Sequence, residues 1–568
     1  MKKIIFILII SFLFFSSVYS QKESYNWYFG ANAAVEFSSG APISLTNSSM
    51  RAYQGCASIS DTAGNLLFYT NGSIVYNRFH QKMPNGSDLL GYGLQNCIIV
   101  PFPNNYEKYY IFTVGYQKHF PTYHFIGLHY SIVNMNLDGG AGDIEPESKN
   151  IPLPHSDKSV YRITAVRHSN NTDIWIIVRN FSDPENEYHS YLVTSSGIND
   201  IPIRSSCLTH ITTTDVPNIG QMKVSPNGRL FFSSMFLLPG DEIGSFNTNT
   251  GEIDIWFTFY ENLLNPQVYG VEFSPNSRYL YVAHTYYIND NNRILQYDLT
   301  QLPDKEAFMQ SRKIIEERAG NVSSLQVGPD GRIYAARNEK KYLGVINNPD
   351  QEGDVCNYDS LGVYLAGYSI SFQGLPQFIQ SYFLRFQYTG KCAGEVFDFT
   401  PNFHPTPDSI HWDFGDPGSG AANFSNESNP QHIYAEGGTY TTTVFVRFPD
   451  GHTEIATREV EVIPLPKPDL GSNLLMCRGE SLTLDAGGDF ARYNWNGALT
   501  PGQRTYMVSD TGTYWVRVMN TQGCFASDTV HVGLFPPPVI NETNLILSPT
   551  TCGGSTGAIR GLEINGTE

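Results

Sequence analysis

The sequence has few charged residues and almost no long amphipathic stretch of Ala, Leu, Lys and Glu, which argues against a helical bundle or a coiled coil. Charged side chains make up only 16% of the 568 residues. The best helix candidate is a short connector, 304–317. No Cys-x-x-Cys pair occurs, which argues against structural zinc and against thiol redox chemistry.

Aromatic residues and turn formers are abundant. Aromatics reach 13%, and there are 50 Gly and 33 Pro. This combination is typical of short strands joined by tight turns. Because the chain is too long for one ordinary core, the sequence predicts an all-β protein of several domains.

The first residues predict an export signal. Lys2 and Lys3 give a positive start, 4–15 is an apolar run, and small residues precede a cleavage point before Gln21. The run is too short for a comfortable membrane span, and no second apolar stretch is long enough to cross a bilayer. We therefore predict a signal peptide at 1–20 and a protein that is secreted or held on the cell surface.

The net charge limits the classes of partner that the protein can bind, and the cysteine count limits its disulfides. A formal charge of −18 repels nucleic acid and anionic lipid head groups, and it favours solubility. An extracellular glycan or protein ligand is expected instead. Eight cysteines in an exported chain can pair, but they are too sparse to form the main framework.

A strand–turn–strand unit recurs in the first two-thirds of the chain. Its clearest copies are 224–232, 273–282 and 327–335, each centred on Pro-Asn-Gly, Pro-Asn-Ser or Pro-Asp-Gly. Pro presets φ at the first turn position, and Asn or Asp followed by Gly tolerates the positive φ that comes next. Recurrence at about 45–55 residues, with four strands in each unit, predicts a β-propeller of about seven blades over 21–383. The alternative is a stack of β-sandwiches.

The next segment resembles a PKD domain, an immunoglobulin-like sandwich of extracellular proteins. The residues that carry the resemblance are Trp412, Asp413, Phe414, Gly415, Asp416, Tyr434, Gly438 and Tyr440. Trp412 and Phe414, two residues apart, are expected on the core face of one strand. The two tyrosines are expected to pack their rings in the core and to reach backbone groups with their hydroxyls. The predicted domain spans 384–463.

A second immunoglobulin-like module is predicted at 464–537. It contains Cys477 and Cys524 with Trp495 between them, which is the framework of an immunoglobulin-like sandwich. A Cys477–Cys524 disulfide is therefore predicted, and the alternative is two unpaired core thiols. Proline runs at 464–468 and 535–538 mark the module's boundaries as semi-rigid spacers.

Two further resemblances concern the ends of the chain. Residues 548–559 resemble the start of the SprB-type repeat of gliding-motility adhesins, so 538–568 is expected to be the truncated beginning of such a repeat. Residues 27–30, 55–61, 64–72 and 83–86 resemble the N-terminal region of large PKD-containing surface proteins, and 374–383 resembles that region's closing segment. This resemblance implies export by the type IX system.

Catalytic, cofactor and metal sites are not predicted. Calcium is the one cofactor weighed, at 138–143, but the oxygen spacing differs from the helix-loop-helix calcium loop and an inter-strand turn is favoured. His119, His124 and His129 lie close in sequence, but an odd separation of five places His124 and His129 on opposite strand faces.

The sequence therefore predicts a non-catalytic binding or adhesion protein, with the propeller as head and the sandwiches as spacers. The alternative is a propeller enzyme, a lyase or glycosidase, that assembles carboxylates from several blades.

Overall fold

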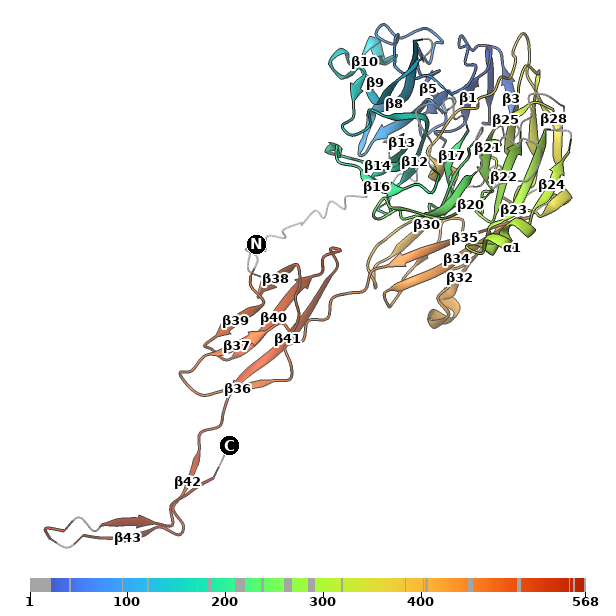
Figure 1. The fold of residues 1–568 in the computed structure, drawn as a ribbon. Coiled ribbons are helices and arrows are strands. Elements are labelled where there is room, and N and C mark those ends of the chain that lie inside the picture. The colour runs from blue at the N-terminus through green and yellow to red at the C-terminus, as the bar shows by residue number, and fades with distance from the viewer. Residues whose placement is uncertain are drawn as a thin grey trace, which may run out of the picture.

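The computed structural model describes residues 22–565 apart from 40–41, 94, 120–121, 171, 182–185, 210–219, 236–239, 260–267, 285–291, 318–319, 384, 402, 404–406, 448–452, 498–501, 551 and 555–556. The predicted signal peptide, 1–20, lies outside these residues. Within them the regular structure is almost entirely strand. A propeller and two sandwiches follow one another, and two nested strand pairs complete the described chain (Figure 1).

Seven small antiparallel sheets, here called blades 1 to 7, occupy the first part of the described chain, which is the number of blades predicted. Blade 1 contains β1 (Asn26–Phe29), β2 (Ala33–Glu36) and β3 (Ile43–Leu45). Blade 2 contains β4 (Ala57–Ser60), β5 (Leu66–Thr70) and β6 (Val75–Asn77). Blade 3 contains β7 (Cys97–Phe102), β8 (Asn105–His119), β9 (Thr122–Asn134), β10 (Asp143–Ile144) and β11 (Ile151–Pro152), with the short helices η1 (Asp138–Gly140) and η2 (Pro146–Ser148).

The later blades repeat a simple up-and-down order. Blade 4 contains β12 (Ser159–Arg167), β13 (Ile174–Phe181), β14 (Asn186–Thr194), β15 (Gly197–Ile198) and β16 (Ile203–Ser206). Blade 5 contains β17 (Met222–Val224), β18 (Leu230–Ser233), β19 (Asp241–Phe246) and β20 (Ile253–Phe259). Blade 6 contains β21 (Val268–Phe273), β22 (Tyr279–His284), β23 (Arg293–Asp298) and β24 (Lys313–Glu316). Blade 7 contains β25 (Val322–Val327), β26 (Ile333–Arg337), β27 (Tyr342–Ile346) and β28 (Tyr358–Tyr364).

Short helices connect strands around blades 6 and 7. They are η3 (Leu299–Gln301), α1 (Lys305–Gln310) and η4 (Gly353–Cys356). The Asp304 side chain accepts a hydrogen bond from the Ala307 amide and begins α1 as an N-cap. The helix predicted over 304–317 is therefore real but shorter, because residues 313–316 form β24 at the edge of blade 6.

The ring closes through the segment 373–378. This segment lies between the inner strand of blade 7 and the start of blade 2: the Ser324 amide donates to Gln373 O, and the Gln377 amide donates to Cys56 O. The innermost position of blade 1 is thereby filled from the far end of the propeller sequence. The Trp27 ring of blade 1 also packs against Tyr334 of blade 7, with centroids 5.3 Å apart. Closure buries the blade faces that an isolated blade would expose and leaves only the short outer edges.

The recurring turns form as their sequence predicts. In 225–228, Gly228 has φ +77°, and the Ser225 hydroxyl accepts hydrogen bonds from the Arg229 and Leu230 amides. In the second copy Ser277 adopts φ +59° where the first copy has glycine. Each turn follows the inner strand of its blade, so all three lie at the same end of the ring.

The next module is a two-sheet sandwich over the predicted PKD segment, preceded by η5 (Gln380–Phe383). One sheet contains β29 (Phe386–Thr389), β30 (Phe397–Pro401) and β33 (Gln431–His432). The other contains β31 (Ser409–Asp413), β32 (Phe424–Ser425), β34 (Gly438–Arg447) and β35 (Thr453–Val462), with η6 (Pro417–Asn423) leading into β32. Aromatic and valine side chains from both sheets form one core.

A second sandwich follows the proline linker, and below it is called the distal module. Its larger sheet contains β36 (Leu474–Met476), β38 (Arg492–Trp495), β40 (Gly512–Met519) and β41 (Phe525–Leu534), and the smaller one contains β37 (Leu482–Asp485) and β39 (Thr505–Val508). Two hairpins complete the described chain, formed by β42 (Val539–Asn541) with β45 (Glu563–Asn565) and by β43 (Ile546–Ser548) with β44 (Ala558–Arg560). The chain beyond residue 464 extends from the propeller as a narrow arm (Figure 1).

Candidate functional site

Buried charged groups meet along the axis of the propeller, where the inner strands of blades 5, 6 and 7 converge. Lys223 Nζ donates to Glu272 Oε2 at 3.0 Å and to Gln326 Oε1 at 2.6 Å. The backbone amides of Phe273 and Val327 also donate to the Glu272 carboxylate. Burial lowers the pKa of Lys223 and raises the pKa of Glu272, while each partner opposes the other's shift.

Glutamine side chains extend this polar network around the axis. Gln221 Oε1 accepts from the amides of Val271 and Leu325, which lie in blades 6 and 7. Gln95 Nε2 donates to Gln377 Oε1 at 2.9 Å, which joins blade 3 to the closing segment. These side chains are fully buried, so they fill the described part of the axis and tie the inner strands together. We infer that this part of the axis is structural.

A second buried charged cluster joins blades 4 and 5. Arg179 Nη1 donates to Glu242 Oε2 at 3.0 Å, and both side chains are fully buried. The Tyr188 hydroxyl donates to the same oxygen, and the amide of Thr209 donates to Glu242 Oε1 at 2.7 Å. Arg162 lies beside the cluster, and burial lowers the pKa of its guanidinium to about 10.

Blade 6 contains a buried histidine with no hydrogen-bond partner on either ring nitrogen in the described structure. His284 is 1% exposed at the end of β22. Burial, and after it the charges of Arg293 and Arg312, lower its pKa to about 3. His284 is therefore neutral in the folded protein at any pH near neutrality.

Acid is expected to destabilise the propeller through His284. The unfolded chain takes up a proton near pH 6.5, whereas folded His284 does so only near pH 3, so stability is lost as pH falls between these values. At about 1.4 kcal/mol per pH unit, this residue costs about 3 kcal/mol between pH 7 and pH 4. Urea unfolding at several pH values should show a shallower acid slope for His284→Leu than for the wild type. The exposed His531→Leu variant is the control, and an unchanged slope in His284→Leu would contradict the assignment.

Three exposed tyrosines lie on one end of the propeller, and we call them the tyrosine face: Tyr53, Tyr92 and Tyr368. Their exposed fractions are 50%, 59% and 96%. The loops that carry them lie side by side, because the Gly55 amide donates to Gly93 O and the Gln373 amide donates to Tyr53 O. The Tyr53 ring packs on Phe372 with centroids 4.5 Å apart. These loops precede inner strands, so they lie at the end of the ring opposite the recurring turns.

The opposite end of the ring contacts the PKD segment through the recurring turns. The Arg385 guanidinium, 5% exposed, approaches the carbonyls of Pro329 and Asp330 in the third turn. Arg458 donates to Phe386 O and packs over the Tyr388 ring at 4.7 Å. A small crevice at this junction is lined by residues from two turns and by the PKD segment. The turns therefore also seat the next module, which their sequence did not indicate.

The residues of the PKD motif lie in the core and turns of that module. Trp412, Phe414 and Tyr434 are buried, and the Tyr434 hydroxyl donates to Phe414 O at 3.1 Å. The Tyr440 ring lies 4.1 Å from that of Tyr434, and its hydroxyl donates to Glu436 O. These contacts hold the two sheets of the sandwich together.

The turn of the motif depends on its acids and its glycine. Asp413 Oδ1 accepts from the Gly415 amide, and Asp416 Oδ2 lies 3.1 Å from His432 Nε2. Gly415 has φ +70°, and a Cβ there would lie 2.4 Å from Thr441 O, so no other residue fits. Gly438 begins β34. All of these residues serve the fold of the module.

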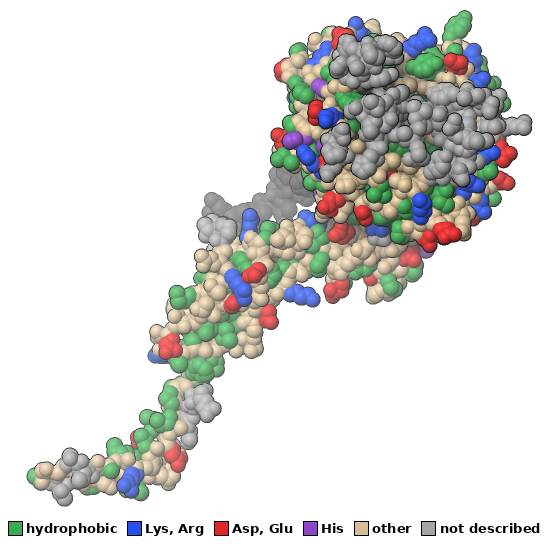
Figure 2. All heavy atoms as spheres, viewed as in Figure 1, with side chains coloured by type: hydrophobic (Ala, Val, Ile, Leu, Met, Phe, Trp, Pro, Cys, Tyr) green, Lys and Arg blue, Asp and Glu red, His purple; other side chains and the backbone are tan. Residues whose placement is uncertain are grey.

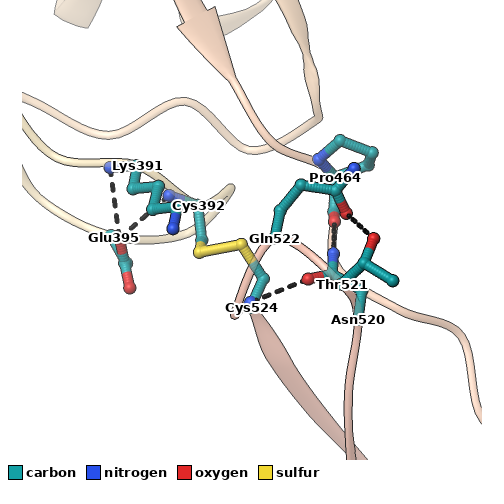
Figure 3. The surroundings of a disulfide bond; sticks show 8 residues. All are labelled: Lys391, Cys392, Glu395, Pro464, Asn520, Thr521, Gln522 and Cys524. Carbon is teal, nitrogen blue, oxygen red and sulfur yellow. Dashed lines mark hydrogen bonds between the residues drawn. A yellow bond between two sulfur atoms is a disulfide. The ribbon is translucent and has the colours of Figure 1, made fainter. Parts of the chain in front are cut away.

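The predicted Cys477–Cys524 disulfide is wrong. Cys524 bonds to Cys392, 132 residues earlier (Figure 3). Cys477 is an exposed free thiol. The bond joins the edge of the PKD sandwich to the β40–β41 turn of the distal module. Asn520 Nδ2 also donates to Pro464 O at 3.1 Å across the same junction. The Cys…Trp…Cys pattern of immunoglobulin-like sandwiches places its first cysteine in the core. Here Cys477 instead lies exposed, directly after β36.

The calcium candidate at 138–143 is a turn between strands of blade 3. Both oxygens of Asp143 are used within the protein: Oδ1 accepts from the Asn85 amide at 2.9 Å, and Oδ2 accepts from Asn85 Nδ2 at 2.7 Å. Gly139, Gly140 and Gly142 adopt positive φ, as such a turn requires. The side chains of His119 and His124 lie outside the described residues. Among the described residues no group of three or more His, Cys, Asp or Glu side chains is arranged to hold a metal ion.

Five carboxylates with nearly unexposed side chains in the described propeller have hydrogen-bond partners within the fold, whereas the buried Oε2 of Glu23 has none. Besides Asp143, Glu242 and Glu272, Asp241 accepts from the Met235 amide, and Asp330 accepts from the Tyr334 hydroxyl at 2.6 Å. No helix among the described residues has the length and apolarity that crossing a bilayer would need.

Residues 387–462 match the family model described as PKD domain. The match covers the first sandwich, so that module is identified by sequence as well as by shape. Together with the Cys392–Cys524 disulfide, it is consistent with an extracellular protein.

Several solved structures resemble the chain at low identity. A protein from Lactobacillus plantarum is 11% identical, with 75% of this chain and 96% of that chain covered, at a TM-score of 0.32. The Myceliophteria thermophila Cps50 (Swd1) β-propeller domain is 8% identical, with 56% and 94% covered, at 0.32. Kuenenia stuttgartiensis hydrazine synthase is 10% identical, with 58% and 88% covered, at 0.32. Likeness at this level carries no argument about ligand or activity.

Proposed function

We propose that this chain is a non-catalytic extracellular binding protein in which the propeller is the ligand-binding head. The observation that carries the proposal is the tyrosine face. The other end of the ring is occupied by the PKD module, so the end with the exposed tyrosines is the one left for a partner. The two sandwiches, joined by a disulfide, connect this head to the paired strands at the end of the described chain.

Tyrosines suit such a surface for a physical reason. Each offers a large, rigid contact area with a polar tip, and little side-chain entropy is lost on binding. Exposed aromatics of this kind are frequent among the residues that dominate binding energy. Exposed tyrosines of this kind suit contact with a glycan or with a protein surface.

We further propose export by the type IX route and display on the cell surface. The proposal rests on the signal-like start of the chain and on the resemblance of its segments to PKD-containing and SprB-type surface proteins. Cell fractionation of an expressing bacterium, with and without that secretion system, tests it. Retention of the protein inside wild-type cells would contradict it.

Loss of ligand binding is expected when the tyrosine face is altered. The full mature chain is first screened on glycan and protein arrays, and the ligands found are then titrated against Tyr53→Ala and Tyr368→Ala. Each substitution should weaken binding by about tenfold or more, as truncation of a central aromatic does at other interfaces. Phe424→Ala, a similarly exposed aromatic on the PKD module, is the matched control and should bind normally.

Two results would overturn the proposal. One is unchanged binding in both tyrosine variants, which would place the ligand elsewhere. The other is turnover of an arrayed glycan by the wild-type chain, which would favour the lyase or glycosidase alternative.

A further inference from the structure

We propose that the distal module carries a binding site of its own for an anionic polysaccharide. A cavity of about 270 Å³ lies on the outer face of its larger sheet. It is lined by Arg492, Asn494, Gly497, Trp515, Arg517, Met519 and Phe525. The site is separate from the tyrosine face, and it gives a binding role to a module otherwise treated as a spacer.

The strand register arranges these side chains in rows. Met519 of β40 lies opposite Arg492 of β38 and opposite Phe525 of β41, which gives one row of three. Two residues along β40, Arg517 lies opposite Asn494, and Trp515 begins the next row. Alternation along the strands puts Tyr493, Trp495, Val516 and Val518 on the other face, in the core. The residues that line the cavity therefore share one face of the sheet, and we call this surface the platform. It spans about 13 Å along β40, which is long enough for a few linked sugar rings.

The platform is positively charged, whereas the whole chain carries a net negative charge. The protein has a net charge of −18, yet two arginines line the cavity and no Asp or Glu does. Both arginines are exposed, and neither forms an ion pair in the described structure. Arg guanidinium groups match carboxylate and sulfate geometry with paired donors. Charge complementarity therefore favours an anionic ligand.

The aromatic side chains favour a sugar as the carrier of that charge. The Arg517 guanidinium lies 4.4 Å from the centroid of the Phe525 ring, which holds its donors in place on the surface. Trp515 is partly exposed in the adjoining row, and a Cβ at Gly497 would lie 3.7 Å from the edge of its ring. The apolar C–H face of a pyranose packs on such rings, while its carboxylate or sulfate reaches the arginines.

The site lies beside the disulfide that joins the two sandwiches. Phe525 directly follows Cys524, whose disulfide anchors the β40–β41 turn to the PKD module. The arm stands clear of the propeller in the space-filling view (Figure 2), so the propeller leaves the distal module accessible.

The test is titration of the full mature chain with oligogalacturonate, using its methyl-esterified form as the uncharged probe. Binding of oligogalacturonate should exceed binding of the ester by at least tenfold. The double variant Arg492→Gln/Arg517→Gln and the single variant Trp515→Ala should each lose tenfold or more. Arg478→Gln removes one exposed charge from the same module outside the cavity and should bind as the wild type does. The tyrosine-face variants should also bind normally, which separates this site from the proposed head.

A second measurement does not depend on any variant folding. Arginine-selective modification of the wild-type chain, read by mass spectrometry, should show protection of Arg492 and Arg517 but not Arg478 when oligogalacturonate is present. The proposal is overturned if no probe binds, if the ester binds equally, or if Arg478→Gln loses as much as the double variant. Poly-glutamate binding as tightly as oligogalacturonate would also overturn it, because the face would then be a site for acidic peptides.

Discussion

Replacing Cys524 with serine is expected to lower the free energy of unfolding of the two sandwich modules by about 5 kcal/mol. The bond closes a loop of 132 residues, and the entropy that it removes from the unfolded chain grows with the length of that loop. Cys392→Ser should cost the same, and the double variant should cost no more than either single one. Cys477→Ser should change stability by less than about 0.5 kcal/mol, because its thiol is exposed and unpaired.

Urea unfolding under non-reducing conditions measures these differences, and peptide mapping identifies the crosslinked pair. Mapping should recover one disulfide-linked peptide pair that contains Cys392 and Cys524. If Cys477→Ser were as destabilised as Cys524→Ser, the bond would lie within the distal module and the two sandwiches would be free to pivot about the proline linker. Tight coupling of the modules therefore depends on this one bond and on the short contacts beside it (Figure 3).

Lys223→Met is expected to destabilise the propeller by about 3–5 kcal/mol. The substitution leaves the Glu272 carboxylate buried without its cation, although two backbone amides still donate to it. An uncompensated buried charge of this kind is far more costly than the pair itself is stabilising. Thermal or urea unfolding of the full mature chain, monitored with a probe in the propeller, measures the loss of stability.

The double variant Lys223→Met/Glu272→Gln provides the control. It removes both charges while keeping the shape of the carboxylate, so it should regain at least half of the stability lost in Lys223→Met. Additive losses in the two single variants would show that Lys223 and Glu272 do not act as a pair. A loss below about 1 kcal/mol in Lys223→Met would show that water reaches the axis.

The regular parts of this protein could be predicted from local sequence. The Pro-Asn-Gly and Pro-Asp-Gly turns favour positive φ at Gly228 and Gly331, which predicts hairpins there, and their spacing predicted a ring of blades. The Trp412 to Asp416 motif predicted a sandwich through its resemblance to PKD domains, and alternation along the strand predicted that Trp412 and Phe414 share the core face. Such features depend on residues close together in the chain, where the turn and strand preferences of each residue decide the outcome.

The buried axis of the propeller and the tyrosine face both depend on residues far apart in the chain. Lys223 and Gln326 are 103 residues apart, and only the closing of the ring brings them within 2.6 Å. The tyrosine face joins loops from the two ends of the propeller sequence in the same way. Single exposed tyrosines carry no pattern, so nothing in the sequence marked them.

The sequence by itself predicted the all-β character and a propeller of about seven blades, because turn chemistry and strand alternation are local. Only the tertiary structure decided which cysteine partners Cys524, which charges pair on the axis, and which side chains share the surface of the distal module. These depend on three-dimensional proximity. The framework motif Cys477…Trp495…Cys524 cannot show that Cys477 lies in a turn that faces solvent, or that the partner of Cys524 comes from another module.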